Sequence, residues 1–392
     1  MPAQDFLATH WQKSPLFMPG AIRSMSPILE PPEFAWLATQ DDVESRLVFT
    51  DRSGSKITYR VETGPFDDQL LASLPPRDWT LLVQDVEKHL PEFSRLLEHV
   101  AFVPDWRIDD LMISFAAPGG SVGPHKDNYD VFLCQGSGRR EWRLASPNET
   151  SASDACEQLE LLQPFTDGSP VTAKNGDVFY LPPEVPHWGI AEEACMTYSI
   201  GMRAPSLGEL RLCFDREVQD IENPFPRMPG ENEIFYTDPD LDHTESAPGR
   251  ISAASIDRCR NLISDDAETS NQYLAIALGC VATDLKAWLA PDIPSAKEIS
   301  DFLISRSGEG PVRVHGMSRI AWWSDDGELI VFTNGVHKAV ALDNLHIVQS
   351  ICSSRLLAEE HLPSLARNEL IQWLLNMGTF DLFTKDDTGG KT

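Results

Sequence analysis

The chain has 392 residues, enough for two or three domains with hydrophobic cores, and its 42% hydrophobic and 23% charged residues are typical of an ordinary globular protein. Its net charge of −28 disfavours direct binding to DNA or RNA, because phosphates carry the same sign. The same charge would attract a basic partner, although solubility alone would also account for it.

Seven cysteines without a Cys-x-x-Cys spacing predict neither a disulfide framework nor a thiolate zinc site, and they indicate a reducing cytoplasm. The first eleven residues lack the basic and apolar regions of a signal peptide. The longest apolar runs, such as 273–282, are too short to span a bilayer. The sequence therefore predicts a cytoplasmic protein without membrane contact.

Residues 1–205 are rich in proline, glycine and short β-like runs, with a helical pattern at 76–99. The expected strands are 111–115, 129–134, 140–144, 177–181 and 196–201. Many short strands separated by turn residues indicate a sandwich or barrel. This part of the chain is expected to form the first domain.

Residues 206–290 change to helical spacing, and an irregular linker over 222–250 interrupts them. They hold no cluster of chemically active residues, so a role in packing or dimerisation is expected. The expected helices are 207–221, 252–265 and 266–289.

Residues 291–392 predict a helix, a small sheet and further helices, which together suggest a winged-helix-like domain. Asp325-Asp326-Gly327 and Asn334-Gly335 are typical hairpin turns between its strands. Few lysines and arginines occur here, so a structural or protein-contact role is favoured over nucleic-acid binding.

His125, Asp127 and His187 are the candidate metal ligands. On a strand, His125 and Asp127 would leave the same face, because they are two residues apart. Two imidazoles and one carboxylate can occupy one face of an octahedral metal and leave three positions open, as in non-haem Fe(II) oxygenases. The alternative for His187 is a half-buried structural histidine beside Trp188.

Arg140 and Ser114 are candidate binding residues for a small acid. If Arg140 faces the barrel interior, its buried guanidinium needs a partner, and a carboxylate fits its fork bidentately. The alternative is an outward arginine held by a surface carboxylate. Ser114 lies on an earlier strand of the same predicted barrel, although buried serines commonly bond to the backbone.

His125-x-Asp127, Arg140 and Pro186-His187 resemble the Jumonji-C (JmjC) class of Fe(II)- and 2-oxoglutarate-dependent oxygenases. Segments 10–16, 106–114 and 135–143 narrow this to a resemblance to the bacterial ribosomal oxygenases, which hydroxylate arginine in ribosomal proteins. The resemblance is continuous over 1–205 and is mainly one of layout over 206–392.

The resemblance implies an α+β chain: a double-stranded β-helix (a cupin-like jelly roll) over 1–205, a helical dimerisation region over 206–290 and a winged-helix-like domain over 291–392. It implies a homodimer in which Fe(II) is held by His125, Asp127 and His187. Arg140 would bind the distal carboxylate of 2-oxoglutarate and Ser114 would assist it, with O2 as the second co-substrate.

The implied reaction is 3-hydroxylation of an arginine in a basic large-subunit ribosomal protein, with release of succinate and CO2. On charge alone, four carboxylates are candidates for contact with the substrate arginine: Asp109, Asp110, Asp130 and Glu141. Three aromatic residues could exclude water from the site: Tyr129, Trp142 and Trp188. The alternatives are a JmjC methyl-lysine demethylase and a non-enzymatic cupin-like metal-binding assembly factor. Arg140 argues against the second, because a metal binder needs no anchor for a dicarboxylate.

Overall fold

The computed structural model describes residues 1–23, 29–54, 56–145, 152–153, 156, 159–162, 165, 169–219, 234–263, 269–305, 311–358, 361 and 367–382. The chain divides into two compact units. The first unit comprises Met1–Ala101, Ile108–Arg203 and Pro239–Leu241. The second comprises Phe102–Arg107, Ala204–Asp238 and Asp242–Thr392. The boundaries at 205 and 290 stay predictions.

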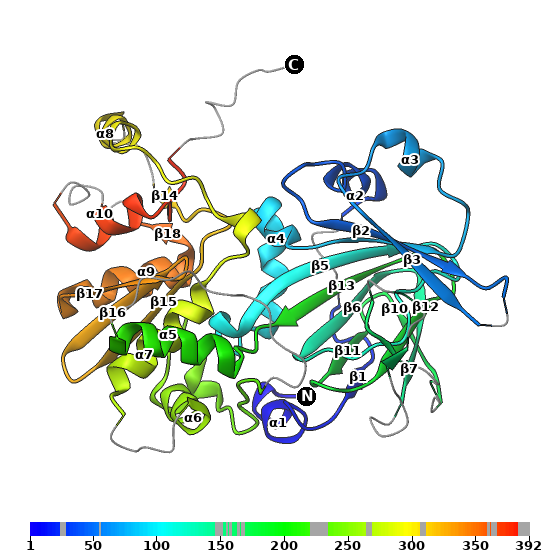
Figure 1. Ribbon diagram of the computed structural model, residues 1–392, viewed down its shortest axis with the longest axis horizontal. Helices are drawn as coiled ribbons and strands as arrows, with labels where there is room; N and C mark the ends of the chain where they lie inside the picture. The colour runs from blue at the N-terminus through cyan, green and yellow to red at the C-terminus, as the bar shows by residue number, and fades with distance from the viewer. Residues whose placement is uncertain are drawn as a thin grey trace. The chain divides into compact units, whose positions relative to one another are not determined.

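The first unit is built on an eight-stranded antiparallel sheet (Figure 1). Its strands, in spatial order, are β1 (Leu16–Met18), β11 (Val178–Leu181), β6 (Val131–Ser137), β13 (Cys195–Met202), β5 (Ile108–Ala116), β4 (Trp79–Val83), β2 (Ser45–Asp51) and β3 (Thr58–Thr63). All eight residues of β13 are buried, as a strand at the centre of a packed sheet requires.

A second, three-stranded sheet has the order β10 (Val171–Lys174), β7 (Arg139–Leu144) and β12 (His187–Ala191). Side chains from both sheets pack into one cluster, which includes Val131, Leu133, Trp142, Ala173 and Phe179. A short pair, β8 (Ala152–Ser153) and β9 (Leu161–Leu162), lies apart from both sheets. Two antiparallel sheets around a shared core confirm the predicted cupin-like jelly roll.

Short helices accompany these sheets: α1 (Ala3–Thr9), α2 (Pro31–Leu37), α3 (Asp68–Ala72), α4 (Val86–His89) and the 3₁₀ helix η1 (Pro91–Val100). The helical pattern expected over 76–99 was wrong in its first part, where the chain forms β4. Trp79-Thr80-Leu81-Leu82-Val83 pairs with β2 on one side and β5 on the other. Pairing on both sides buries a run of apolar and β-branched residues whatever its local helical spacing.

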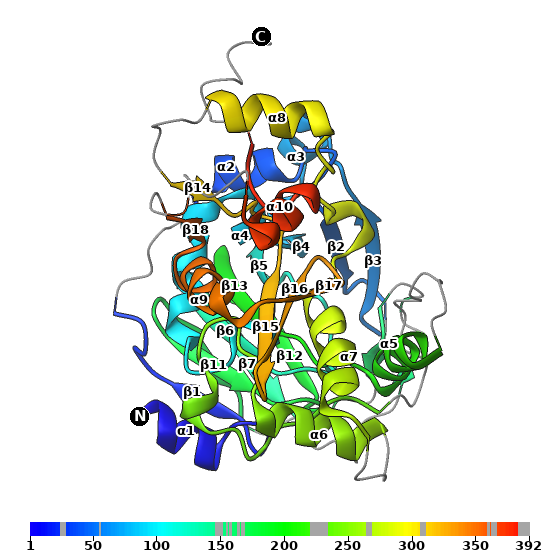
Figure 2. The same cartoon turned by 90° about the vertical axis from the view of Figure 1, so that its left-hand side faces the viewer.

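The second unit has two hydrophobic clusters. In the first, helices α5 (Leu207–Gln219), α6 (Ala253–Ile263) and α7 (Asn271–Thr283) pack together. Helix α7 is buried from Leu274 to Thr283 and lies against the sheet β15 (Ile320–Asp325), β16 (Glu328–Thr333) and β17 (Val336–Val340), as Figure 2 shows. The expected helices at 207–221, 252–265 and 266–289 are thus present in shorter form, and residues 220–221 and 264–268 lie outside the described part.

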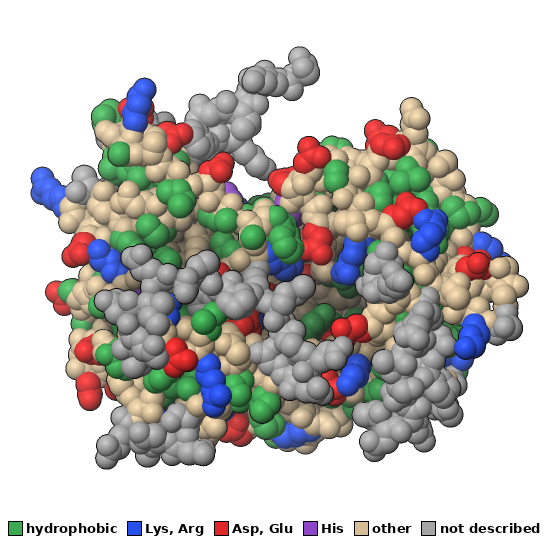
Figure 3. Space-filling model, viewed as in Figure 1, with side chains coloured by type: hydrophobic (Ala, Val, Ile, Leu, Met, Phe, Trp, Pro, Cys, Tyr) green, Lys and Arg blue, Asp and Glu red, His purple; other side chains and the backbone are tan. Residues whose placement is uncertain are grey.

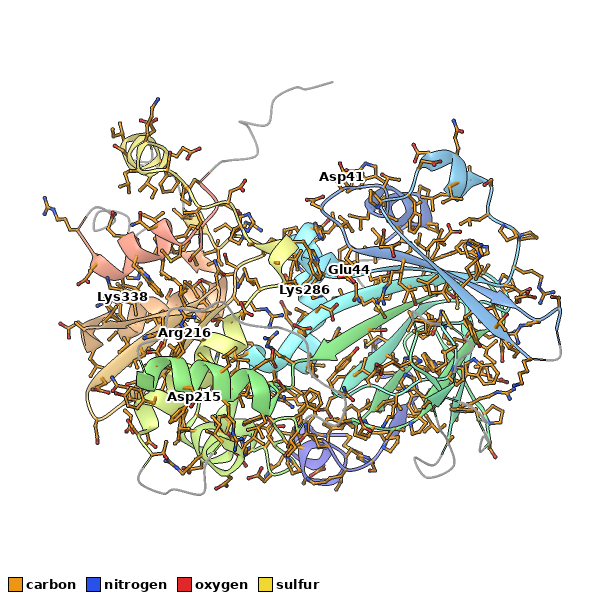
Figure 4. All side chains as sticks on the ribbon, in the orientation of Figure 1. Asp41, Glu44, Asp215, Arg216, Lys286 and Lys338 are labelled. Atoms are coloured by element: carbon orange, nitrogen blue, oxygen red, sulfur yellow. The ribbon has the colours of Figure 1, made fainter. Side chains whose placement is uncertain are left out.

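The second cluster joins α8 (Ala296–Ser305), α9 (Leu345–Ser354) and α10 (Glu369–Asn376) to the other face of that sheet and to the short pair β14 (Val312–Arg313) and β18 (Leu356–Leu357). Both predicted hairpin turns are confirmed, with positive φ at Asp326-Gly327 and Asn334-Gly335. Figure 4 marks Asp215 and Arg216 on α5, and Lys338 on β17, which pairs with Glu369 at 2.7 Å. Much of the linker at 222–250 lies outside the described residues.

All seven cysteines are free thiols, as their spacing predicts. Among the helices that the structure describes, none has the length and apolar composition needed to cross a bilayer.

Candidate active site

His125, Asp127 and His187 come together in the first unit. One ligand atom from each lies within 4.8 Å of the others, and no further group of three such residues meets this condition in the described part of the chain. The His125 Nε2 atom is 4.0 Å from Asp127 Oδ1, and the His187 Nε2 atom is 3.7 Å from Asp127 Oδ2. The structure therefore brings together the three residues that the sequence predicts.

Backbone hydrogen bonds bring His125 and His187 together. His187 is the first residue of β12, and His125 bridges to it through two hydrogen bonds, from His125 N to His187 O at 3.0 Å and from His187 N to His125 O at 2.8 Å. The expectation of a regular strand through His125 and Asp127 was wrong. Gly123 has a φ of +86°, Pro124 has no N–H, and the segment is a loop that is held by this bridge and by backbone hydrogen bonds from Leu162 N to Pro124 O and from Glu184 N to Asp127 O, both at 2.8 Å.

Each imidazole is oriented by its other ring nitrogen. His125 Nδ1 lies 3.0 Å from Gly123 O, and His187 Nδ1 lies 3.0 Å from Val185 O. A carbonyl can only accept, so each Nδ1 carries the proton and each Nε2 lone pair is left for a metal. Burial, followed by the nearby His125, lowers the pKa of His187 to about 4, which keeps its imidazole neutral as a metal ligand requires.

Arg140 lies on β7 between Ala173 of β10 and Ala191 of β12, and it is 5% exposed. Its Nε and Nη2 atoms have no hydrogen-bond partner among the described residues. Its guanidinium carbon is 5.7 Å from the centre of the Trp142 ring, two residues further along the same strand. A buried guanidinium with unpaired donors is a favourable receptor for a carboxylate, and the outward alternative does not apply.

Ser114 is buried on β5, opposite Thr197 of β13 and Leu82 of β4. Within the described residues, no hydrogen bond joins it to Arg140 or to the three ligands. Its assignment to the co-substrate therefore stays a prediction.

The four candidate carboxylates occupy different environments. Asp130 is fully buried and accepts hydrogen bonds from the Tyr180 hydroxyl and, at 2.8 Å, from Gln12 Nε2. Glu141 lies on β7 next to Arg140 and pairs with Arg143 Nε at 2.7 Å. Asp130 thus joins Gln12 to Tyr180 inside the fold, whereas Glu141 forms an ion pair along its own strand.

Asp109 and Asp110, at the start of β5, are related to the metal ligands through Tyr129. The charge of Asp127 raises the pKa of the Tyr129 phenol well above its usual value, and desolvation, Asp110 and Asp109 add to this. Tyr129 is 41% exposed, so it stands where three carboxylates and solvent meet. Arg203 Nη1 lies 3.6 Å from Asp109 Oδ1, so this cluster of carboxylates already includes a cation of the protein itself.

Of the aromatic residues predicted to line the site, Trp142 lies beside the metal ligands and Trp188 does not. Trp142 is buried, and its ring centre lies 6.1 Å from that of His187, so it forms part of the wall beside the ligands. Trp188 follows His187 on a strand and therefore faces the other side, where its Nε1 donates to Ser121 Oγ at 2.9 Å.

Gln84 and Arg46 belong to this region and were not predicted. Gln84 contacts Asp110, and Arg46 contacts Gln84. No motif links the three positions, because β2, β4 and β5 bring them together from distant parts of the sequence.

Comparisons with known proteins agree with this site. A JmjC domain matches residues 95–210. The chain is 36% identical to the ribosomal protein uL16 3-hydroxylase of Escherichia coli, over 84% of each chain. It is 32% identical to a probable ribosomal oxygenase of Haemophilus influenzae, over 69% of this chain and 62% of the relative.

Solved structures of E. coli YcfD superpose over 97% of this chain and 98% of theirs. One has a TM-score of 0.72 at 28% identity, and a ribosomal oxygenase complex with cobalt and 2-oxoglutarate has a TM-score of 0.70 at 29% identity.

The fold and the cluster of two histidines and one aspartate define a JmjC oxygenase, a 2-oxoglutarate-dependent dioxygenase with Fe(II) as its metal. Within that class, the chain belongs to the family of ribosomal oxygenases. Its donor set of two neutral imidazoles and a carboxylate suits ferrous iron, and the unpaired nitrogens of Arg140 suit an acidic co-substrate.

Proposed function

We propose that this protein hydroxylates a side-chain carbon of an arginine in a basic large-subunit ribosomal protein, consuming 2-oxoglutarate and O2 and releasing succinate and CO2. The observation that carries the proposal is the convergence of His125, Asp127 and His187 in the same jelly roll as the buried, unpaired guanidinium of Arg140. Metal ligands alone would fit a binding protein, whereas Arg140 adds an anchor for an acid.

We assign the iron to His125 Nε2, His187 Nε2 and the Asp127 carboxylate. When bound there, iron with 2-oxoglutarate and O2 supplies the oxidant for an unactivated C–H bond. The chain contributes fixed ligand orientation through the Gly123 and Val185 carbonyls. Arg140 would receive the distal carboxylate of 2-oxoglutarate, with Ser114 assisting. Trp142 beside His187 would keep water away from the reacting face.

The preference for arginine rests on the charges beside Tyr129. A guanidinium favours a negatively charged surrounding and can stack on an aromatic ring, and Tyr129 offers such a ring near Asp127, Asp110 and Asp109. A methylated lysine lacks the planar fork that makes bidentate pairing with a carboxylate favourable. This arrangement supports arginine hydroxylation over demethylation.

Mass spectrometry tests the proposal. The purified protein would be incubated with Fe(II), 2-oxoglutarate and separate basic ribosomal proteins, beginning with uL16, because the E. coli relative is named for that substrate. We expect a gain of one oxygen on an arginine. Loss of a methyl group would instead identify a demethylase, and an unchanged mass with bound metal would favour a metal-binding assembly factor.

A further inference from the structure

The loop that carries His125 is attached to strand β12 at two places. At one end of β12, Ala191 N donates to Gly120 O at 3.0 Å, and at the other end His125 and His187 form the bridge described above. Between these attachments the loop has one residue more than the strand, as in a β-bulge, so residues 121–124 leave the register of β12. Buried backbone groups in this stretch therefore need hydrogen-bond partners other than the strand.

The Ser121 hydroxyl provides such a partner. Its Oγ accepts from Gly123 N at 3.0 Å and from Trp188 Nε1 at 2.9 Å, and the residue is 1% exposed. A hydroxyl oxygen has two lone pairs, so both bonds can exist at the same time. Thr50 Oγ1 also donates to Ser121 O at 3.3 Å, which fixes the residue from strand β2. One oxygen atom thus connects the loop to the residue that follows His187.

Gly123 links Ser121 to the His125 ring. Its N–H is held by the Ser121 hydroxyl, and its carbonyl oxygen lies 3.0 Å from His125 Nδ1. A Cβ on Gly123 would lie 3.1 Å from Tyr59 Cε2 and would also collide with Leu161 Cδ2, so these side chains close the space beside the loop. Gly123 is thus fixed by a bond at each end and by packing, and a rotation of its peptide groups would move the carbonyl that orients the ring.

Trp188 is a firm anchor for the Ser121 hydroxyl. It pairs with Arg143 of β7 in the sheet, and the Arg143 guanidinium carbon lies 5.6 Å from its ring centre. His187, its neighbour on β12, is oriented by Val185 O. Because β7 holds the strand and Val185 holds the imidazole, a loop released from the indole would move relative to His187 rather than together with it.

We propose that Ser121 is a positioning residue for the metal centre: its hydroxyl keeps the two ligands of the loop, His125 and Asp127, within reach of the ligand on β12. Ser121 would touch neither the metal nor a substrate, and it would act through the backbone of Gly123. This inference rests on the metal assignment made under the proposed function, and it does not depend on which protein is hydroxylated.

The first test compares Ser121→Ala with Ser45→Ala. Ser45 is a matched control: it is also 1% exposed, it belongs to the same unit, and its hydroxyl donates to Ala38 O at 3.3 Å. We expect Ser121→Ala to weaken Co(II) binding about tenfold, because two donors lose their acceptor and the loop is released. Titration calorimetry would measure the affinity, and Ser45→Ala should bind Co(II) like the wild-type protein. Unchanged affinity in Ser121→Ala, or an equal loss in both variants, would overturn the proposal.

The variant Trp188→Phe removes the indole donor and leaves Ser121 in place, so it tests the proposal even where Ser121→Ala does not fold. We expect it to weaken Co(II) binding about threefold. Trp79→Phe is its control and should bind like the wild-type protein, because Trp79 Nε1 donates to Pro75 O and not to this loop. In the Ser121→Ala background, Trp188→Phe should add less than about a twofold change, since the bond that it removes is already gone. Wild-type affinity in Trp188→Phe, or full additivity of the two substitutions, would refute the connection.

The visible spectrum of bound Co(II) separates a displaced ligand from a less stable fold. Its absorption bands depend on the number and arrangement of the ligands, so Ser121→Ala should change them at saturating Co(II), whereas Ser45→Ala should not. Identical spectra in all three proteins would show that the loop keeps its place and would overturn the inference. If the wild-type protein binds Co(II) and hydroxylates no arginine, the proposed substrate fails, while these measurements still decide the role of Ser121. A wild-type protein that binds no Co(II) would refute the metal assignment and this inference together.

Discussion

At the residue scale, the three candidate ligands differ in how firmly the protein holds them. His187 is 3% exposed and begins a strand, whereas Asp127 lies in the loop between β5 and β6 and is partly exposed. A backbone bond from Glu184 N to Asp127 O at 2.8 Å ties this loop to the turn before His187, and Lys126 pairs with Glu184 across the same gap. Asp127 is thus placed by its backbone more than by its side chain.

Asp127→Ala should abolish hydroxylation and weaken metal binding by at least an order of magnitude, because it removes the only anionic ligand of the three. Calorimetric titration with Co(II) or Fe(II) under nitrogen would measure the loss. His99→Ala, at an exposed histidine of the same unit, serves as the control and should bind metal like the wild-type protein. Unchanged affinity in Asp127→Ala would remove that residue from the site.

Arg140→Ala should raise KM for 2-oxoglutarate about a hundredfold, since an interior charge-assisted pair contributes on the order of 3 kcal/mol. Metal affinity should change little. Arg139→Ala is the matched control: the neighbouring arginine on the same strand is exposed and pairs with Glu192 at 3.3 Å. Equal KM values in the two variants would contradict the role of Arg140.

How far the sequence reveals the site depends on the kind of residue. The metal ligands could be recognised from sequence, because two histidines and an aspartate at the ends of short β segments are an uncommon set. Arg140 could be recognised because it shares one face of its strand with Trp142 and Leu144. The contacts of Gln84 with Asp110 and Arg46 could not be predicted from sequence. Neither residue type is unusual, and the contacts depend on the register of the paired strands. Asp130 resembled a substrate contact in sequence, whereas its hydroxyl and amide partners appear only in the fold.

At the element scale, a buried ion pair fixes the chain just before β5. Arg107 and Asp238 are both 0% exposed, with Nε 3.1 Å from Oδ2 and Nη2 3.1 Å from Oδ1. The Arg107 guanidinium also lies 5.3 Å from the centre of the Tyr236 ring. Strand β5, which carries Asp109, Asp110 and Ser114, begins at the next residue.

Arg107→Ala should lower the free energy of unfolding by about 3–5 kcal/mol, because it leaves the Asp238 carboxylate buried and unpaired. Urea denaturation would measure the change. The double replacement Arg107→Met with Asp238→Leu removes both charges and should restore most of the stability. A double variant as unstable as the single one would show that packing, rather than the uncompensated charge, causes the loss.

The two hairpin turns of the second unit offer a matched pair of substitutions. Gly335 and Gly327 have φ of +80° and +85°, so alanine should cost about 1 kcal/mol at each. A Cβ at Gly335 would also lie 2.9 Å from Asp284 Oδ1, whereas one at Gly327 meets nothing within 4 Å. Thermal denaturation should therefore show a larger loss for Gly335→Ala, and equal losses would contradict the steric contribution.

Elements were predictable where local and tertiary preferences agree. The Asn334-Gly335 and Asp326-Gly327 turns were read correctly because their backbone conformation is dictated by the residues themselves. Residues 79–83 were misread because their strand state depends on two neighbouring strands that the local sequence does not contain. The loop at His125 was misread for a related reason, since its backbone partners, His187 among them, are distant in sequence.

At the scale of the whole molecule, acidic residues outnumber basic ones by 60 to 32. On the face shown in Figure 3, acidic and basic side chains are interspersed over the described surface. A net charge of −28 then acts on a basic partner mainly through the summed field. Dimerisation through residues 206–290 and a cytoplasmic location stay predictions.

Association with a basic ribosomal protein should slow steeply with added salt, because the Debye length shrinks from about 10 Å at 0.1 M to about 3 Å at 1 M. Stopped-flow measurements should give an association rate constant that falls by at least tenfold over this range, while dissociation changes less. A rate constant that is indifferent to ionic strength would exclude electrostatic steering.

The two carbonyl groups beside the imidazoles also bear on proton balance during iron uptake. Because Gly123 O and Val185 O each accept from Nδ1, the proton of each neutral ring is on the nitrogen that faces away from the metal position. Iron can therefore bind both Nε2 atoms without displacing a proton from either ring, in contrast to thiolate sites, whose ligands must first be deprotonated.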